Sequence, residues 1–423
     1  MDIDGKEDSI EELKGLRITP LDDDDDDDDE EIAVDDDEDD DEEEEAVILG
    51  FVEKPQHSWS VLRQQFPSKA GGVPAWLDAY NLPSGMSCVC DICGQPLQFV
   101  LQVYAPLVEK DSTFHRTLFV FMCLSMKCLQ RDQHEQWKRH PEKQSRSVKV
   151  FRCQLPRANT FYSSEPPKGN ATDKPLTPGA PLCNWCGTWK GDKFCSSCKI
   201  AQYCSQKHQA MHWHSGHKLE CQQLRLSPQS SDCNACDGGI TEIRAQKVAS
   251  KTLWPEYEIK NEHESDYDTE MSGDDGHTNN SLVSRNRIDD SMKSLMDNFE
   301  GDADKKSWAS FQERIANSPE QVLRYCRSAC SKPLWPMSGG RPSKADIARC
   351  SYCGGLLCFE FQILPQLLYY FGVKDEDHSL DWATIVVYTC EASCEGIDYS
   401  CLYGLGLESQ VASSSREPIL PQS

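Results

Sequence analysis

The chain has 423 residues, 38% of them hydrophobic, and a formal net charge of −27. A chain of this length can hold two or three small domains, and the low hydrophobic content indicates that part of it is disordered. The acidic balance argues against direct nucleic-acid binding, and the lack of a long apolar run or a secretory signal predicts an intracellular protein without a membrane segment.

Residues 1–45 are predicted to form a disordered acidic arm. Asp22–Glu31 and Asp35–Glu45 together hold 21 acidic residues and no basic one, so the rest of the chain carries only about −6. Like charges at this density repel one another and bury no apolar surface. The sequence leaves open whether the arm only keeps the chain soluble or also screens a basic partner.

A folded β domain is predicted over 46–157, beginning with a short apolar strand at Ala46–Leu49. Apolar and polar residues alternate over Leu97–Val103, which is typical of a half-buried strand, and Thr117–Phe121 is predicted to be its partner. Residues 158–180 are rich in proline, serine, threonine and glycine, which predicts a linker.

The next segment, 181–223, is rich in cysteine and histidine. Its potential metal ligands come in four pairs: Cys183/Cys186, Cys195/Cys198, Cys204/His208 and His217/Cys221. In a reducing compartment clustered cysteines are metal ligands and not disulfides, and thiolate with imidazole favours Zn²⁺ over harder cations. Eight ligands are enough for two tetrahedral zinc sites.

This segment resembles the MYND-type zinc finger. The residues that carry the resemblance are Tyr203-Cys204-Ser205, Gln209, Trp213, His217-Lys218 and Cys221. The resemblance implies interleaved sites, with these ligands: Cys183, Cys186, Cys204 and His208 for zinc 1, and Cys195, Cys198, His217 and Cys221 for zinc 2. A RING finger fits less well because it requires a Cys-x-His that is absent here. His212 and His214 are spare histidines and are predicted to be exposed.

Residues 224–300 are polar and are predicted to be a disordered linker, and 301–407 are predicted to form a C-terminal domain before a loose tail at 408–423. Three apolar residues recur at helical spacing near the start of that domain: Trp308, Phe311 and Ile315. Ser318–Gln321 has the features of a helix start, with a serine cap and a proline in the first turn.

One cysteine-rich sequence motif occurs twice, once in each predicted β domain. The two sets are Cys90, Cys93, Cys123 and Cys128, and Cys350, Cys353, Cys390 and Cys394. A glutamine, Gln102 or Gln362, follows the second cysteine by nine residues in both copies. In each copy a Cys-x-x-Cys turn, called a zinc knuckle, and a second cysteine pair at the end of the returning strand bring four thiolates together, as in a zinc ribbon. This arrangement predicts two more zinc sites, zinc 3 in the first copy and zinc 4 in the second. Because the closing cysteine pairs are more widely spaced than usual, these cysteines could instead be reduced thiols in the core that bind no metal. In the first set, Cys88 is an alternative ligand to Cys90.

These features predict a mixed α+β fold of small zinc-stabilised domains. Two related zinc-clipped β units are expected to flank the MYND-type finger, with long disordered segments and about four structural zinc ions. Each predicted site is closed by four protein ligands, and no nucleophilic set stands apart from the metal clusters, so no enzyme activity is expected.

The chain as a whole resembles the programmed cell death protein 2 family. The matching stretches include Leu49-Gly50-Phe51, Gln65–Lys69, Pro74–Leu77, Leu101–Leu107, Glu320–Tyr325 and Thr389–Cys394. The resemblance implies a dedicated chaperone for a basic ribosomal protein of the small subunit, which acts in cytoplasm and nucleus to support small-subunit biogenesis. It also implies links to cell proliferation and programmed cell death. The alternative is a MYND-type adapter in transcriptional regulation, which would bind other MYND ligands such as short proline-containing peptides.

Overall fold

The computed structural model describes residues 47–136, 145–226, 248–268, 302–328, 331–339, 341–343, 345–374, 376, 378–395, 403–404 and 411–414. All of them belong to one unit, Glu45–Ser423. The predicted acidic arm, much of the predicted linker over 224–300 and most of the predicted tail lie outside the described residues.

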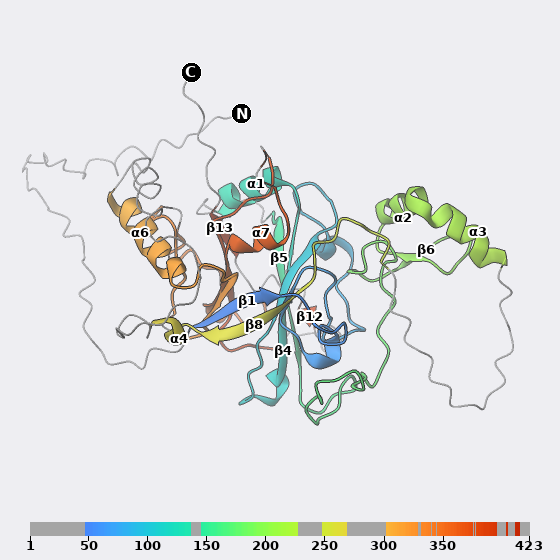
Figure 1. Cartoon of the computed structure of the whole chain (residues 1–423), viewed down its shortest axis with the longest axis horizontal. Helices are drawn as coiled ribbons and strands as arrows, with labels where there is room; N and C mark the ends of the chain where they lie inside the picture. The colour runs from blue at the N-terminus through green and yellow to red at the C-terminus, as the bar shows by residue number, and fades with distance from the viewer. Residues whose placement is uncertain are drawn as a thin grey trace, which may run out of the picture. The chain divides into compact units, whose positions relative to one another are not determined.

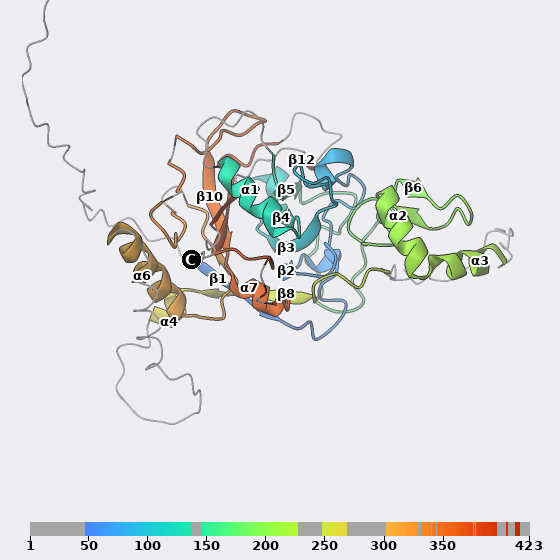
Figure 2. The same cartoon turned by 90° about the horizontal axis from the view of Figure 1, so that it is seen from above.

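Within the described residues, most strands join one antiparallel sheet with the order β12-β5-β4-β3-β2-β8-β1-β9-β10-β11-β13. These strands are β1 (Ile48–Glu53), β2 (Lys69–Ala70), β3 (Gln98–Tyr104), β4 (His115–Met122), β5 (Val148–Leu155), β8 (Tyr257–His263), β9 (Leu323–Tyr325), β10 (Leu357–Ile363), β11 (Thr384–Cys390), β12 (Tyr403–Gly404) and β13 (Val411–Ser414). The short strands β6 (Lys193–Phe194) and β7 (Gln202–Tyr203) pair separately. Figure 2 shows β5, β4, β3, β2 and β8 following one another across the large sheet.

The helices are α1 (Met126–Gln136), α2 (Gln206–His212), α3 (Lys218–Leu226), α4 (Ser265–Asp268), α6 (Asp302–Ala316) and α7 (Gln366–Tyr370). The apolar spacing that predicted a helix is confirmed in α6, where Trp308, Phe311 and Ile315 are buried against Leu364. The helix start predicted at Ser318 is wrong, because the chain turns there and enters β9. No helix in the described part of the chain combines the length and the hydrophobicity needed to cross a membrane.

The two cysteine-rich copies have the same strand register. A bulge between Phe99 and Leu101 shifts the pairing of β3 with β4, and a bulge between Phe359 and Phe361 shifts the pairing of β10 with β11. Both bulges fall six to eight residues after the second knuckle cysteine. The repeat seen in the sequence is therefore also a repeat of backbone structure.

The repeated glutamine has the same task in both copies. Gln102 Oε1 accepts a hydrogen bond from Ala75 N at 2.8 Å, and Gln362 Oε1 accepts one from Leu334 N at 2.7 Å. Each glutamine is buried and binds the backbone of a segment that lies outside the hairpin. A buried amide must be hydrogen-bonded, so the glutamine fixes that segment to the sheet.

The predicted layout of two β units flanking the finger is not confirmed, because strands of both copies join in one sheet. β1 pairs along its full length with β8, and it also pairs with β9. Figure 1 shows β1 and β8 side by side. One buried cluster contains side chains of both copies, among them Leu101, Val120, Phe361 and Val387. The sheet therefore continues through both copies, and their apolar side chains share one core.

Two segments predicted as linkers join the sheet or pack against its core. Strand β8 lies in the range predicted to be disordered, and the disorder prediction does not hold for it. Ile259 of β8 is buried, and a Cβ atom built on Gly50 of β1 would lie 2.9 Å from its side chain, so the crossing requires glycine. In the predicted linker 158–180, Tyr162 is buried and its hydroxyl donates to the carbonyl of Leu77 at 2.6 Å.

Candidate metal centres

The structure brings together the four ligands predicted for zinc 1. Cys183 and Cys186 lie in a tight turn in which Gly187 N donates to Cys183 O, Cys204 follows β7, and His208 lies in α2. Ser205 caps α2 by accepting a hydrogen bond from His208 N at 3.1 Å, which aims the imidazole at the sulfurs. The Cys183 Sγ–His208 Nδ1 distance is 3.7 Å, and the Cys186 Sγ–Cys204 Sγ distance is 3.9 Å.

The ligands predicted for zinc 2 also form one cluster. Cys195 and Cys198 flank a turn after β6 that ends at Lys199, whose φ is +56°. His217 ends a π-helical turn, and Cys221 lies one turn later in α3. Cys195 Sγ lies 3.8 Å from Cys221 Sγ, and Cys198 Sγ lies 3.7 Å from His217 Nε2. All four ligand residues are buried.

The first cysteine-rich copy places the zinc 3 residues at the end of its hairpin. Cys90 and Cys93 flank a turn closed by a hydrogen bond from Gly94 N to Cys90 O, and Gly94 has a φ of +68°. Cys123 follows β4 and Cys128 lies in α1. Cys93 Sγ lies 3.6 Å from Cys123 Sγ. Cys88 is not a member of this cluster; its buried thiol contacts Ser87, and burial raises its pKa to about 12.

The second copy repeats this arrangement for zinc 4. Gly354 N donates to Cys350 O, and Gly354 has a φ of +69°. Cys390 is the last residue of β11, and Cys394 follows four residues later. The Cys350 Sγ–Cys394 Sγ distance is 3.5 Å, and the Cys353 Sγ–Cys390 Sγ distance is 3.6 Å. Cys93 and Cys353, which occupy the same position in the two copies, are both exposed.

The geometry of all four sets fits zinc. Within each set the ligand atoms lie within 4.8 Å of one another. Sulfurs bound at 2.3 Å around a tetrahedral Zn²⁺ stand about 3.8 Å apart, close to the sulfur separations above, and a disulfide at about 2.05 Å is far shorter. Burial raises the pKa of the Cys90 thiol to about 11, so a cation is needed to keep it as a thiolate at neutral pH. When bound, zinc would have a structural role, because each set already supplies four ligands.

A further histidine packs on the zinc 2 set, because the ring of His212 stacks on that of His217 with their centroids 4.8 Å apart. His212, which was predicted to be exposed, is buried, and its Nδ1 lies 3.0 Å from the hydroxyl of Tyr203. The carboxylate of Glu220 lies 3.6 Å from His212 Nε2 and 3.7 Å from His217 Nδ1. A carboxylate on the second nitrogen of a ligand histidine fixes its tautomer and orientation. The sequence predicted neither the position of Glu220 beside His217 nor the burial of His212, whereas His214 is exposed as predicted.

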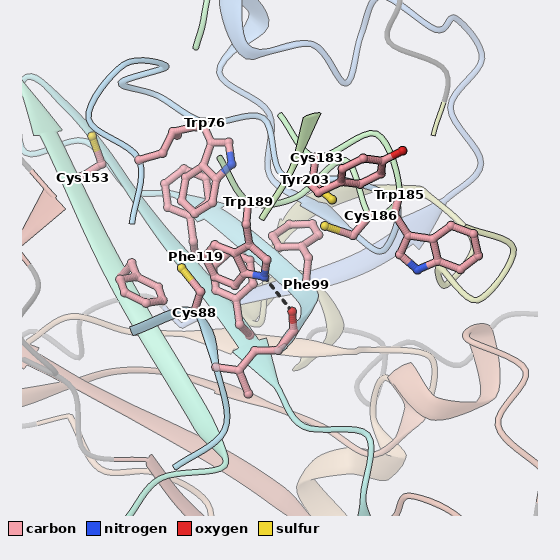
Figure 3. Close-up of a cluster of buried hydrophobic side chains, with 14 of the residues drawn as sticks. Trp76, Cys88, Phe99, Phe119, Cys153, Cys183, Trp185, Cys186, Trp189 and Tyr203 are labelled. Carbon is pink, nitrogen blue, oxygen red and sulfur yellow. Dashed lines mark hydrogen bonds between the residues drawn. The ribbon is translucent and has the colours of Figure 1, made fainter. Parts of the chain in front are cut away.

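The finger is anchored to the first copy by tryptophans that the ligand pattern did not reveal. Trp189 is 1% exposed and lies 4.4 Å from the ring of Phe121, and its indole N–H donates to Leu97 O at 3.0 Å. Trp76 in turn donates to Thr188 O at 2.8 Å. Figure 3 shows the two tryptophans together, with the Trp189 hydrogen bond as a dashed line. The finger and the first copy thus share one buried core.

The described residues define a mixed α/β protein with a large antiparallel sheet, a zinc-finger module and four Cys/His clusters that could hold structural zinc. Family models match in three places: the programmed cell death protein 2 N-terminal domain at residues 46–169, the MYND finger at 183–221 and the programmed cell death protein 2 C-terminal putative domain at 305–403. The chain is 37% identical to programmed cell death protein 2 of Bos taurus over 360 residues, which cover 83% of this chain and 93% of that protein. It therefore belongs to the programmed cell death protein 2 family.

Other relatives agree with this assignment. Programmed cell death protein 2 of Rattus norvegicus is 37% identical over 362 residues, covering 84% of this chain and 94% of that protein. Programmed cell death protein 2-like of Homo sapiens is 28% identical over 384 residues, covering 82% and 91%. The names of these relatives carry no catalytic activity. No solved structure matches the chain.

Proposed function

We propose that the chain is a non-enzymatic, zinc-stabilised escort of a basic ribosomal protein of the small subunit, and that it acts in cytoplasm and nucleus. The observation that carries the proposal is the family match, which spans both end domains and the finger. The 21 acidic residues of Asp22–Glu31 and Asp35–Glu45 add a charge that complements such a client. The four closed ligand sets support a structural and not a catalytic role for zinc.

In this proposal the acidic residues attract the basic client. Ribosomal proteins are strongly basic, and a dense negative charge raises the rate of encounter with a basic partner in a salt-dependent way. Side chains from both copies fill the core between the hairpins. A client site is therefore expected on outer surfaces or on the acidic residues and not between the inner faces of the copies.

Affinity capture tests the proposal. Tagged full-length chain is recovered from cells at low and at high salt, and its partners are identified by mass spectrometry. We expect a small-subunit ribosomal protein, with faster association at low salt. Replacing the acidic residues of 22–45 by asparagine and glutamine should slow association about 10-fold or more, as loss of steering does. A chain with residues 22–45 in scrambled order, which keeps their charge, serves as the control. Recovery of chromatin corepressors without any ribosomal protein would contradict the escort role.

A second candidate function is a MYND-type adapter. Three large apolar side chains of the finger region are exposed: Phe194 at 56%, Ile200 at 47% and Leu219 at 67%. Exposed apolar side chains on a small module can bind a peptide. Changing Phe194 and Ile200 to serine separates the candidates, since an adapter loses its partners and an escort that uses other surfaces keeps its client.

A further inference from the structure

The zinc 4 set closes a loop that contacts the first cysteine-rich copy. We call residues Glu391–Cys394 the cluster 4 loop. Lys110 Nζ donates to the carbonyl of Ser393 at 3.1 Å, and Arg152 Nη2 donates to the carbonyl of Cys394 at 2.6 Å. Both cationic side chains belong to the first copy, so the loop is bound across the boundary between the copies.

The side chain of Ser393 lies at the centre of this contact. It is 1% exposed, accepts a hydrogen bond from Arg116 Nε at 3.0 Å and donates to Gln154 Oε1 at 2.7 Å. Arg116 also pairs with Glu360 of the second copy, with Nη2 2.7 Å from Oε2, and neither side chain is exposed. Buried polar networks of this kind are stable only when every member keeps its partner.

The backbone of the loop is held in an unfavourable conformation. Ser393 has a φ of +44°, in the left-handed region that residues with a Cβ rarely adopt. Such strain persists only where the surrounding structure fixes it. Cys390 and Cys394, two members of the zinc 4 set, stand on either side of Ser393, and Ser393 N donates to Cys390 O at 2.9 Å.

The equivalent loop of the first copy is bound differently. Cys123 N donates to Ser147 O at 2.8 Å and Cys128 N to Ser125 O at 2.9 Å, and both acceptors lie in the same copy as the donors. The two clusters thus share the geometry of the Cys-x-x-Cys turn, but only the cluster 4 loop is held by hydrogen bonds from cationic side chains of the other copy.

We propose that zinc 4 is a latch between the two copies. It holds the cluster 4 loop in the strained conformation that presents the carbonyls of Ser393 and Cys394 to Lys110 and Arg152. Zinc 3 closes a loop whose backbone hydrogen bonds stay within the first copy, although Met126 and Leu129 of α1 also pack in the core shared by both copies. Loss of the ion from cluster 4 loosens the contact between the copies and leaves the finger folded. This inference is independent of the proposed function, because it concerns the chain without any client.

Thermal unfolding of the full-length chain tests the latch. Arg152→Ala is made in three backgrounds: the unchanged chain, Cys394→Ser and Cys128→Ser, with zinc content measured by mass spectrometry. Each cysteine variant should lose about one zinc ion. Arg152→Ala should lower Tm by about 3 °C in the unchanged chain and in Cys128→Ser, and should have no further effect in Cys394→Ser. An equal shift in all three backgrounds, or a lost shift in both cysteine variants, overturns the proposal.

A second measurement keeps all ligands in place and does not require the cysteine variants to fold. Coupling between two sites is reciprocal, so a broken contact must also weaken zinc 4. In Arg152→Ala, alkylation of Cys394 under a mild chelator should become several-fold faster while alkylation of Cys128 stays unchanged. Arg131→Ala, an exposed arginine of α1, is the matched control. An unchanged rate at Cys394, or equal acceleration at both cysteines, overturns the latch.

Discussion

Glu360 has no contact with solvent, and its charge is held mainly by the buried Arg116, with further hydrogen bonds from the hydroxyls of Thr389 and Tyr325. Burial alone would raise the pKa of this carboxyl, but the charge and hydrogen bonds of Arg116 outweigh that effect and hold the pKa below its ordinary value of 4.5. In the unfolded chain the carboxyl titrates at its ordinary value. Stability from the ionised pair is therefore fully present above about pH 4.5 and is lost as the pH falls through the folded-state pKa.

Glu360→Gln tests this assignment. The change leaves the Arg116 guanidinium buried without its counter-charge, so we expect the free energy of unfolding at pH 7 to fall by about 3–5 kcal/mol. The loss of stability between pH 4.5 and more acidic values should become shallower, which urea unfolding over a pH series measures. Glu53→Gln, an exposed carboxyl of β1, is the control. A loss at Glu360 no larger than at Glu53 would show that the pair contributes nothing.

The packing of the finger against the large sheet depends on one tryptophan, Trp189. Trp189 is almost fully buried and hydrogen-bonds to the residue before β3, yet it is not a metal ligand. Trp189→Ala removes a large buried side chain, which costs about 3–5 kcal/mol, and it should leave the zinc content unchanged. Trp213→Ala, at a 36% exposed tryptophan of the same finger, should cost far less. Equal effects in urea unfolding would mean that the finger is not anchored through Trp189.

Local sequence patterns predicted the parts of the molecule whose determinants are close in the chain. Cysteine spacing identified four sets that the structure brings together. Alternation located β3, but the prediction that this strand is half-buried is wrong, because Val100 and Gln102 on its second face are buried as well. The joining of both copies into one sheet was not predicted, since it depends on β8, a single strand between long polar stretches. The Arg116–Glu360 pair was also missed, because the two residues are 244 positions apart and charged residues in strands ordinarily face solvent. Non-local pairing leaves no periodic signal in either segment.

The rate of zinc release should distinguish the four clusters, because their ligands differ in exposure to solvent. The sets of the two cysteine-rich copies each have one exposed ligand, Cys93 and Cys353, whereas no ligand of the finger sets is exposed. Purified protein should hold about four zinc ions, one for each four-ligand set. A chromogenic chelator should remove two ions quickly and two slowly, since an exposed thiolate exchanges first.

The assignment of the fast phase is tested by Cys353→Ser, which should lower the total by one ion and the fast phase from two ions to one. Zinc binding to closed four-ligand sites is coupled to folding, so the fast phase should coincide with loss of the large sheet and precede unfolding of the finger. A total of two ions per chain, both released slowly, would show that the repeated cysteines are reduced core residues. In that case the shared hydrophobic core, and not metal, would hold the two copies together.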